Sequence, residues 1–299
     1  MDVLVTGSSG LIGAALAPVL EAAGHRVIRL RRTAATAPDL GWDPDAATID
    51  GVGLEGIDAV VHLAGEGIAE KRWTPEQKAR ILESRTRGTD LLARTLAGLT
   101  HKPRVLVSAS AIGYYGNRGD ERLTEQSESG SGFLAEVCRA WEEATAPAAA
   151  AGIRVAFART GIVLSPKGGA LAQMLTPFKL GLGGRLGSGH QYMSWITLVD
   201  EVRALVQLVE DERLAGPVNL TAPNPVTNRE LTKALGHALH RPTVLPTPLF
   251  PLRKRYGREL VQELLLDGQR VLPDALTGVG FEFLSPQLGV ALDAILRDG

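Results

Sequence analysis

The chain has 299 residues, of which 44% are apolar, and carries 32 basic against 33 acidic side chains. Its length suits one large α/β domain or two small ones, and its near-zero net charge gives no bulk attraction to nucleic acid or to an anionic membrane, so we expect neither as a partner. The single cysteine, Cys138, excludes an internal disulfide and fits a reducing compartment.

The first strand is expected to begin at Asp2 or Val3, which leaves no room for a signal peptide. No apolar run approaches the roughly 20 residues that span a bilayer. We therefore expect a cytoplasmic location.

Predicted strands and helices alternate along the first half of the chain. The strands are expected at residues 3–5, 27–30, 41–43, 59–63, 105–108 and 155–164, and the helices at 11–23, 74–99 and 133–146. Thr74 is a favourable N-cap, with Pro75 at the first helical position and Gln77 closing a capping box. The alternation predicts an α/β fold with a Rossmann-type, doubly wound parallel sheet, in which ligands bind over the carboxyl ends of the strands.

The second half is less regular. It is expected to hold a glycine-rich loop with a short helix at 168–189, a helix at 198–210 capped by Thr197, a returning strand at 218–220, and helices near 228–239 and 259–266. We predict that residues 1–165 and 190–222 form the cofactor-binding Rossmann domain. Residues 166–189 and 223–299 then form a smaller C-terminal subdomain on the substrate side.

Three glycines, Gly7, Gly10 and Gly13, lie three residues apart between the first strand and the first helix. A sharp turn there exposes free N–H groups at a helix N-terminus, which favours an anion such as phosphate. This predicts dinucleotide binding; a tight turn without a ligand is the alternative. The residues of the turn that we expect to contact the cofactor are Gly7, Ser8, Ser9, Gly10, Leu11 and Ile12.

The end of the second strand distinguishes NADP from NAD. An acidic residue there would bind the ribose 2′-hydroxyl of NAD, whereas arginine accommodates a 2′-phosphate. The chain has Arg29, Arg31 and Arg32 there, and no acid before Asp39. We therefore predict NADP, bound by Arg31 and Arg32; an arginine-rich strand end exposed to solvent is the alternative.

The fourth strand ends in His62-Leu63-Ala64-Gly65-Glu66. Small residues let the backbone approach the cofactor, so Leu63, Ala64 and Gly65 are expected to contact it. His62 is expected to be structural. Glu66 either faces the reaction centre or is an ordinary exposed turn residue.

Further candidates follow the fifth and sixth strands. Ser108 and Ala109 end the fifth strand, and Arg159 and Ile162 end the sixth near the expected position of the nicotinamide. Residues 191–195 are candidates for the substrate pocket, although Trp195 also suits a core position.

The motifs taken together resemble a known family. They are VTGSSGLIG, HLAGEGIAEKRW, ILESR, SASAIGYYG, GFLAEVCRAWE, MSWI with Asp200 nearby, PVTNRELTKALG and LLLDGQRVLP. They resemble extended short-chain dehydrogenases/reductases of the NAD-dependent epimerase/dehydratase type, and more narrowly the YfcH-like "epimerase family". The resemblance implies an NADP-dependent oxidoreductase or epimerase that transfers hydride to or from a small polar substrate, and it suggests a homodimer.

The chain departs from the wider superfamily on the helix after the fifth strand. That helix usually carries Tyr-x-x-x-Lys, but residues 133–138 contain neither tyrosine nor lysine. Ser110 matches the superfamily's serine and would polarise a substrate oxygen, while Tyr114 would supply a phenol, which at an ordinary pKa near 10 acts more readily as an acid. Tyr115 and Cys138 are expected to be packing residues. Without the Tyr/Lys pair, an NADP-binding sensor or structural protein without turnover is the alternative function.

Two further clusters are weaker candidates. His237 and His240 lie three apart on a predicted helix, but no third ligand converges on them, so no metal is expected. Arg253, Lys254 and Arg255, with Arg258, are expected to form a solvated helix start. A phosphate or anionic-substrate site is the alternative.

Overall fold

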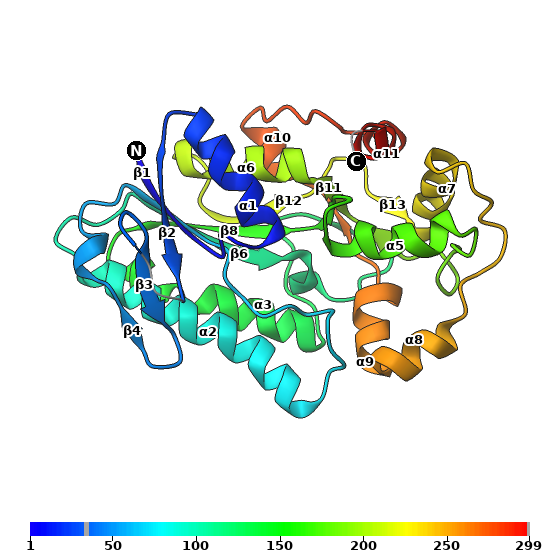
Figure 1. Ribbon diagram of the computed structural model, residues 1–299, viewed down its shortest axis with the longest axis horizontal. Coiled ribbons are helices and arrows are strands. Elements are labelled where there is room, and N and C mark those ends of the chain that lie inside the picture. The colour runs from blue at the N-terminus through cyan, green and yellow to red at the C-terminus, as the bar shows by residue number, and fades with distance from the viewer. Residues whose placement is uncertain (33–35, 298–299) are drawn as a thin grey trace.

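The computed structural model describes residues 1–32 and 36–297, and it is built around one large sheet (Figure 1). The strands are ordered β12-β8-β6-β5-β1-β2-β3-β4 and run parallel except for the pair β3–β4. Their bounds are β1 (Asp2–Thr6), β2 (Arg26–Arg31), β3 (Leu40–Asp43), β4 (Thr48–Ile49), β5 (Ala59–His62), β6 (Val105–Ala111), β8 (Arg154–Thr160) and β12 (Gly216–Leu220). This confirms the predicted α/β, Rossmann-type sheet.

Helices cover both faces of the sheet because the strands are apolar on both faces. In β1, Val3 and Val5 pack in the core under α1 (Leu11–Ala22) and α6 (Leu198–Glu210). Leu4 points the other way, into the core shared with α2 (Pro75–Gly98) and α4 (Ala146–Ala150). Helix α3 (Phe133–Glu143) packs beside α2, and Figure 1 shows both below the sheet with α1 and α6 above it.

The helix caps are mostly as predicted. The Thr74 hydroxyl accepts from the amide of Gln77 at 3.2 Å, and the Thr197 hydroxyl accepts from that of Asp200 at 3.1 Å. The predicted capping box at Gln77 is wrong, because its side-chain amide donates to the Glu66 carboxylate instead, at 3.5 Å.

The predicted strand 155–164 is wrong as a single element, because it divides at Gly161 into β8 and β9 (Ile162–Leu164). A Cβ at Gly161 would lie 2.7 Å from the carbonyl oxygen of Ser194 and 2.9 Å from the Thr221 side chain. The backbone passes close to both neighbours, and β9 leaves the sheet to pair with β11 (Trp195–Thr197).

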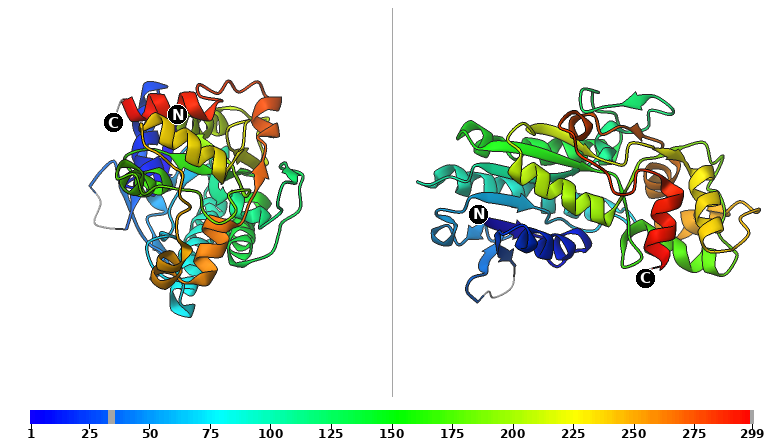
Figure 2. Two further views of the ribbon diagram at one scale, coloured as in Figure 1. Left: turned by 90° about the vertical axis from the view of Figure 1, so that its right-hand side faces the viewer. Right: turned by 90° about the horizontal axis from the view of Figure 1, so that it is seen from above.

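Smaller elements follow the sheet. They are the 3₁₀ turns η1 (Val52–Leu54) and η2 (Ile112–Tyr115), the strands β7 (Arg122–Leu123), β10 (Tyr192–Met193), β13 (Val226–Thr227) and β14 (Arg270–Val271), the helices α5 (Gly169–Lys179), α7 (Asn228–Ala238), α8 (Leu249–Tyr256), α9 (Arg258–Val261), α10 (Asp274–Gly278) and α11 (Leu288–Arg297), and the π-helical turn η3 (Gln262–Leu266). Trp195 is fully buried in a separate core with residues of α5, α7 and α11. Figure 2 shows α7, α8 and α11 together at one end of the molecule.

Two details of this part differ from expectation. The basic run Arg253–Arg255 lies in the last turn of α8 rather than at a helix start, because α8 begins at Leu249 and Gly257 follows it at a φ of 92°. The predicted helix 259–266 is α9 continued by η3. No helix in the described ranges is both long and apolar enough to cross a bilayer.

Candidate functional site

The turn between β1 and α1 can be built only from glycine at two of its positions. Gly7 has a φ of 65°, and a Cβ there would lie 2.7 Å from the carbonyl carbon of Leu63. A Cβ at Gly13 would lie 2.3 Å from the Gly7 carbonyl oxygen. Gly10 is the N-cap residue of α1 and has no side chain to accept from the first-turn amides. The start of α1 therefore offers backbone donors to an external acceptor.

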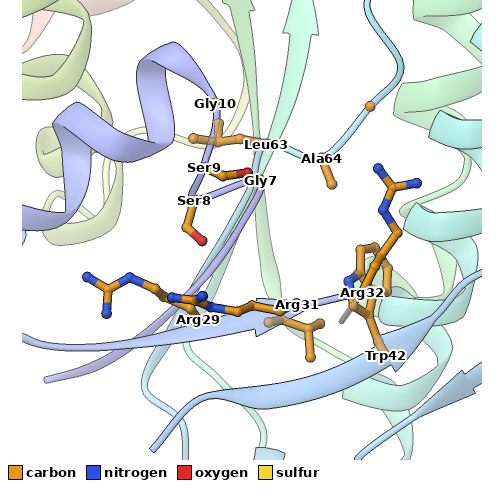
Figure 3. A pocket seen from close by; sticks show the side chains of 12 residues that line it. Gly7, Ser8, Ser9, Gly10, Arg29, Arg31, Arg32, Trp42, Leu63 and Ala64 are labelled. Carbon is orange, nitrogen blue, oxygen red and sulfur yellow. The ribbon is translucent and has the colours of Figure 1, made fainter. Parts of the chain in front are cut away.

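A cavity of about 440 Å³ opens beside this turn (Figure 3). Its lining residues are Gly7, Ser8, Ser9, Gly10, Arg29, Leu30, Arg31, Arg32, Trp42, Leu63, Ala64 and Gly65. Nine of them were predicted cofactor contacts, whereas Arg29, Leu30 and Trp42 were not. The other predicted contacts, Leu11, Ile12, Ser108, Ala109, Arg159 and Ile162, are not among the lining residues.

The basic side of the cavity also contains a carboxylate. Arg31 donates from Nε to Asp39 at 2.9 Å, and the backbone amide of Arg29 donates to the same carboxylate at 3.2 Å. Asp39 comes close because β3 returns alongside β2. Figure 3 shows Arg29 and Arg31 on the side of the strand below Ser8, with Arg32 next to Trp42. Alternation along β2 separates Arg32 from the other two.

His62 is a structural hub beneath the cavity. The Thr6 hydroxyl accepts from the amides of Leu63 at 3.1 Å and Ala64 at 3.2 Å, so its proton is free to donate to His62 Nδ1 at 2.7 Å. His62 Nε2 then donates to the Thr89 hydroxyl at 2.9 Å. Burial lowers the pKa of His62 to about 4, so the ring is neutral near pH 7. The chain of hydrogen bonds holds the backbone of residues 63–64 against Gly7, in agreement with the predicted structural role.

Ser110 lies at the end of β6 and is only 4% exposed. Its hydroxyl donates to Glu142 Oε1 at 2.7 Å, and Arg159 donates to both oxygens of that carboxylate at 2.8 Å each. An ionised carboxylate can only accept, so the Ser110 proton lies in this bond. The free positions of the Ser110 oxygen are lone pairs, which accept from a donor.

Arg159 links this pair to the two tyrosines. Its guanidinium lies 3.4 Å from the centre of the Tyr114 ring and donates to the Tyr115 hydroxyl at 3.1 Å. Tyr115 donates to the Asn219 side chain at 2.7 Å, and burial raises its pKa, which agrees with its predicted packing role. Tyr114 is the more exposed of the two and lies over the network as a partly buried ring.

The residues of α3 that meet the end of β6 are not proton-transfer groups. A Cβ at Gly113 would lie 3.2 Å from Leu134 and 3.8 Å from the sulfur of Cys138. These two residues have the four-residue spacing of a Tyr-x-x-x-Lys pair, and Glu142 follows at the same interval. Burial raises the pKa of Cys138 to about 11, so its thiol stays protonated.

Arg85 is a residue that sequence reasoning missed. It donates to the carbonyl of Glu66 at 3.0 Å, lies against Gly65 and stacks on Trp141 at 4.8 Å. The motif ILESR contains it, but nothing in the motif showed that α2 brings it under the loop after β5. The Glu66 carboxylate is 32% exposed and lies 3.8 Å from Lys71.

A second buried carboxylate lies behind the end of β8. Glu201 is fully buried, and one oxygen accepts from the Thr160 hydroxyl at 2.8 Å. The other oxygen has no partner within the described residues. Burial raises the pKa of Glu201 to about 8.

Residues 3–220 match the model of the NAD dependent epimerase/dehydratase family, and residues 247–295 match a domain of unknown function, DUF1731. The chain belongs to this epimerase/dehydratase family. In the described residues of this family member, no group of three or more His, Cys, Asp or Glu side chains could hold a metal ion.

Several characterised sequences and structures are similar over nearly their whole length. The epimerase family protein MT2273 of Mycobacterium tuberculosis is 48% identical over 291 residues, covering 97% of this chain and 96% of the relative. The crystal structure of the human epimerase family protein SDR39U1 with NADPH is 33% identical, with a TM-score of 0.91 and full coverage of both chains. The nucleoside-diphosphate sugar epimerase of Corynebacterium glutamicum is 39% identical, with a TM-score of 0.81, covering 99% of this chain and 58% of that one.

Proposed function

We propose that this protein binds NADP(H) in the cavity beside the β1–α1 turn. The observation that carries the proposal is the fit of this turn to a pyrophosphate, because Gly7 and Gly13 leave no room for side chains where the backbone would meet it. The similar human protein crystallised with NADPH supports the same cofactor. Leu11 and Ile12 would contribute backbone amides, while Ser108, Ala109 and Ile162 are proposed contacts farther along the cofactor.

Arg29 and Arg31 are the proposed 2′-phosphate ligands, with Arg32 closing the other side of the cavity. The three guanidinium groups outweigh the one carboxylate of Asp39, so the site stays cationic. Asp39 holds Arg31 in place, which lowers the ordering cost of binding. Replacing Arg29 and Arg31 by alanine should lower NADPH affinity far more than NADH affinity in calorimetric titrations. An unchanged ratio of the two affinities would contradict this assignment.

We infer further that the protein is an oxidoreductase or epimerase acting on a small polar substrate. Bound NADP supplies the hydride acceptor or donor. Ser110 lies at the strand end next to the proposed nicotinamide site and has only lone pairs to offer, so it would accept a hydrogen bond from a substrate hydroxyl. Its proton is already held by Glu142, which would orient the serine. Tyr114, with Glu66, would exchange the proton with the substrate or solvent.

This orientation of Ser110 favours an alcohol as the group bound in the resting enzyme. The test is a panel of small polyols with NADP⁺ and a panel of carbonyl compounds with NADPH, followed by absorbance of the reduced cofactor. Turnover should appear, and Ser110→Ala and Tyr114→Phe should each depress it without changing NADPH affinity. Turnover that survives both substitutions would contradict the assigned roles.

An NADP-binding sensor is the second candidate. It is favoured by Leu134 and Cys138 lying where proton-transfer groups would be expected, and by the use of every Ser110 and Glu142 contact within the fold. A sensor should gain several degrees of melting temperature with NADPH and show no turnover on either panel. Absence of any NADPH-dependent shift would remove the base of both candidates.

Three coarser features complete the proposal. We propose a homodimer, tested by light scattering, and a cytoplasmic location, supported by the lone buried thiol of Cys138. The division into residues 1–165 with 190–222 and 166–189 with 223–299 is supported by the separate core around Trp195. Limited proteolysis should cleave first at the exposed connections between these parts.

A further inference from the structure

The near-neutral net charge hides an uneven distribution. Residues 166–199 and 231–258 contain no aspartate or glutamate. Their basic residues are Lys167, Lys179, Arg185, Lys233, Arg241, Arg253, Lys254, Arg255 and Arg258. The acidic residues that balance the chain therefore lie elsewhere.

These two segments form one surface. Arg241 donates from Nε to the carbonyl of Lys179 at 2.8 Å, and the amide of Thr247 donates to the carbonyl of Arg185 at 2.9 Å. The end of α5 thus lies against the connection between α7 and α8. Figure 1 places both at the end of the molecule away from β2 and β3. This surface is consequently far from the proposed 2′-phosphate site.

The same surface exposes large apolar side chains. Of the nine such residues in the described part of the chain, five belong to it: Leu180 (69% exposed), Leu182 (71%), Val244 (86%), Leu245 (77%) and Phe250 (76%). We call these five, together with Lys179, Arg241, Arg253, Lys254 and Arg255, the distal surface. Within the described residues, no carboxylate lies within 4.0 Å of any of these five basic groups.

We propose that the distal surface docks on an anionic lipid membrane. Each apolar side chain stands more than two-thirds clear of the protein, which suits insertion between lipid head groups. The unpaired basic groups beside them suit the phosphates of an anionic leaflet. An acidic protein partner would match the charges, but it would also need a separate pocket for each protruding side chain. The chemistry therefore favours a lipid surface over a protein.

The first test is flotation of the full chain with vesicles of phosphatidylcholine and phosphatidylglycerol, compared with phosphatidylcholine alone. Binding should require the anionic lipid and weaken as salt is raised. The triple variant Arg253→Ser/Lys254→Ser/Arg255→Ser should lower the partition coefficient roughly 100-fold, and Lys254→Ser alone about fivefold. Leu245→Ser with Phe250→Ser should also lower it, with no recovery at low salt.

Matched controls separate this surface from charge and hydrophobicity in general. Arg80→Ser/Arg87→Ser/Arg94→Ser removes the same charge from the exposed side of α2, and Val52→Ser removes an equally exposed apolar side chain. Both should leave vesicle binding within about twofold of the unchanged chain. Circular dichroism and light scattering establish that each variant is folded and unaltered in assembly.

Three results would overturn the proposal. The first is no binding to anionic vesicles, including the case where only an acidic protein or a second copy of the chain is bound. The second is equal binding to neutral and anionic vesicles. The third is a loss of binding in the α2 control as large as in the α8 triple variant.

Discussion

Alanine at Gly7 offers the sharpest test of the β1–α1 turn, because two separate costs apply there. The φ of 65° is unfavourable for a residue with a side chain, at about 1–2 kcal/mol. A Cβ would also meet the backbone of Leu63 and Ala64 at 2.7 and 2.9 Å, which no rotamer change relieves. Forced overpacking of this kind typically adds about 1–3 kcal/mol. We expect Gly7→Ala to lower the free energy of unfolding by about 2–5 kcal/mol.

Two other glycines separate the costs. Gly24 has a φ of 84° but nothing within 4 Å of an added Cβ, so Gly24→Ala should show the backbone cost alone. Gly13 lacks a positive φ, yet its added Cβ would lie 2.3 Å from the Gly7 carbonyl oxygen, so Gly13→Ala should show the contact cost alone. The Gly7→Ala cost should approximate the sum of the other two.

Urea unfolding of the chain without cofactor measures these differences, and calorimetry measures NADPH affinity in each folded variant. Gly7→Ala and Gly13→Ala should lose NADPH binding by at least tenfold, about 1.4 kcal/mol, while Gly24→Ala should retain it. If Gly7→Ala were no less stable than Gly24→Ala, the close approach to Leu63 would not be a real constraint. If Gly7→Ala kept full NADPH affinity, the turn would not be the pyrophosphate site.

Three further predictions concern buried charge. Because His62 has its pKa lowered from 6.5 to about 4, the unfolded chain binds a proton first as pH falls; stability is present above about pH 6.5 and is lost down to pH 4, by up to about 3 kcal/mol, and urea titrations of the unchanged chain and His62→Gln should differ in this window. Glu201 has its pKa raised from 4.5 to about 8, so its contribution is present at low pH and is lost as pH rises from 4.5 to 8; Glu201→Gln should therefore be more stable than the unchanged chain at pH 9 relative to pH 5. Glu142→Gln leaves Arg159 buried without its carboxylate and should cost about 3–5 kcal/mol in thermal or urea unfolding, whereas Asp90→Asn, which breaks an exposed ion pair, should cost under about 1 kcal/mol.

The sheet was predictable because its signals are local. Apolar runs of four to seven residues, a glycine turn and capped helices such as the one after Thr74 identify a doubly wound fold without long-range information. The failures occurred where distant backbone decides. Gly161 divides β8 from β9 because residues 194 and 221 pass beside it, and neither contact is visible in the strand's own sequence.

The site was predictable for its backbone parts and less so for its side chains. The glycines and the small residues at 63–65 line the cavity as expected, because their role follows from chain geometry. Asp39 enters the basic cluster only because β3 pairs with β2. Arg85 and Glu142 come from helices far along the chain, where an isolated charge is usually exposed.

The network around Glu142 gives physical content to the missing Tyr-x-x-x-Lys pair. A carboxylate and a guanidinium are both costly to bury, and here each is satisfied only by the other together with Ser110 and Tyr115. That network fixes the direction of the Ser110 proton before any substrate arrives, whereas a tyrosine with its lysine would leave the proton mobile. The same residues that make the strand end rigid therefore restrict the serine to accepting a hydrogen bond. A substrate hydroxyl meets that requirement, and a carbonyl meets it only after Ser110 has released Glu142.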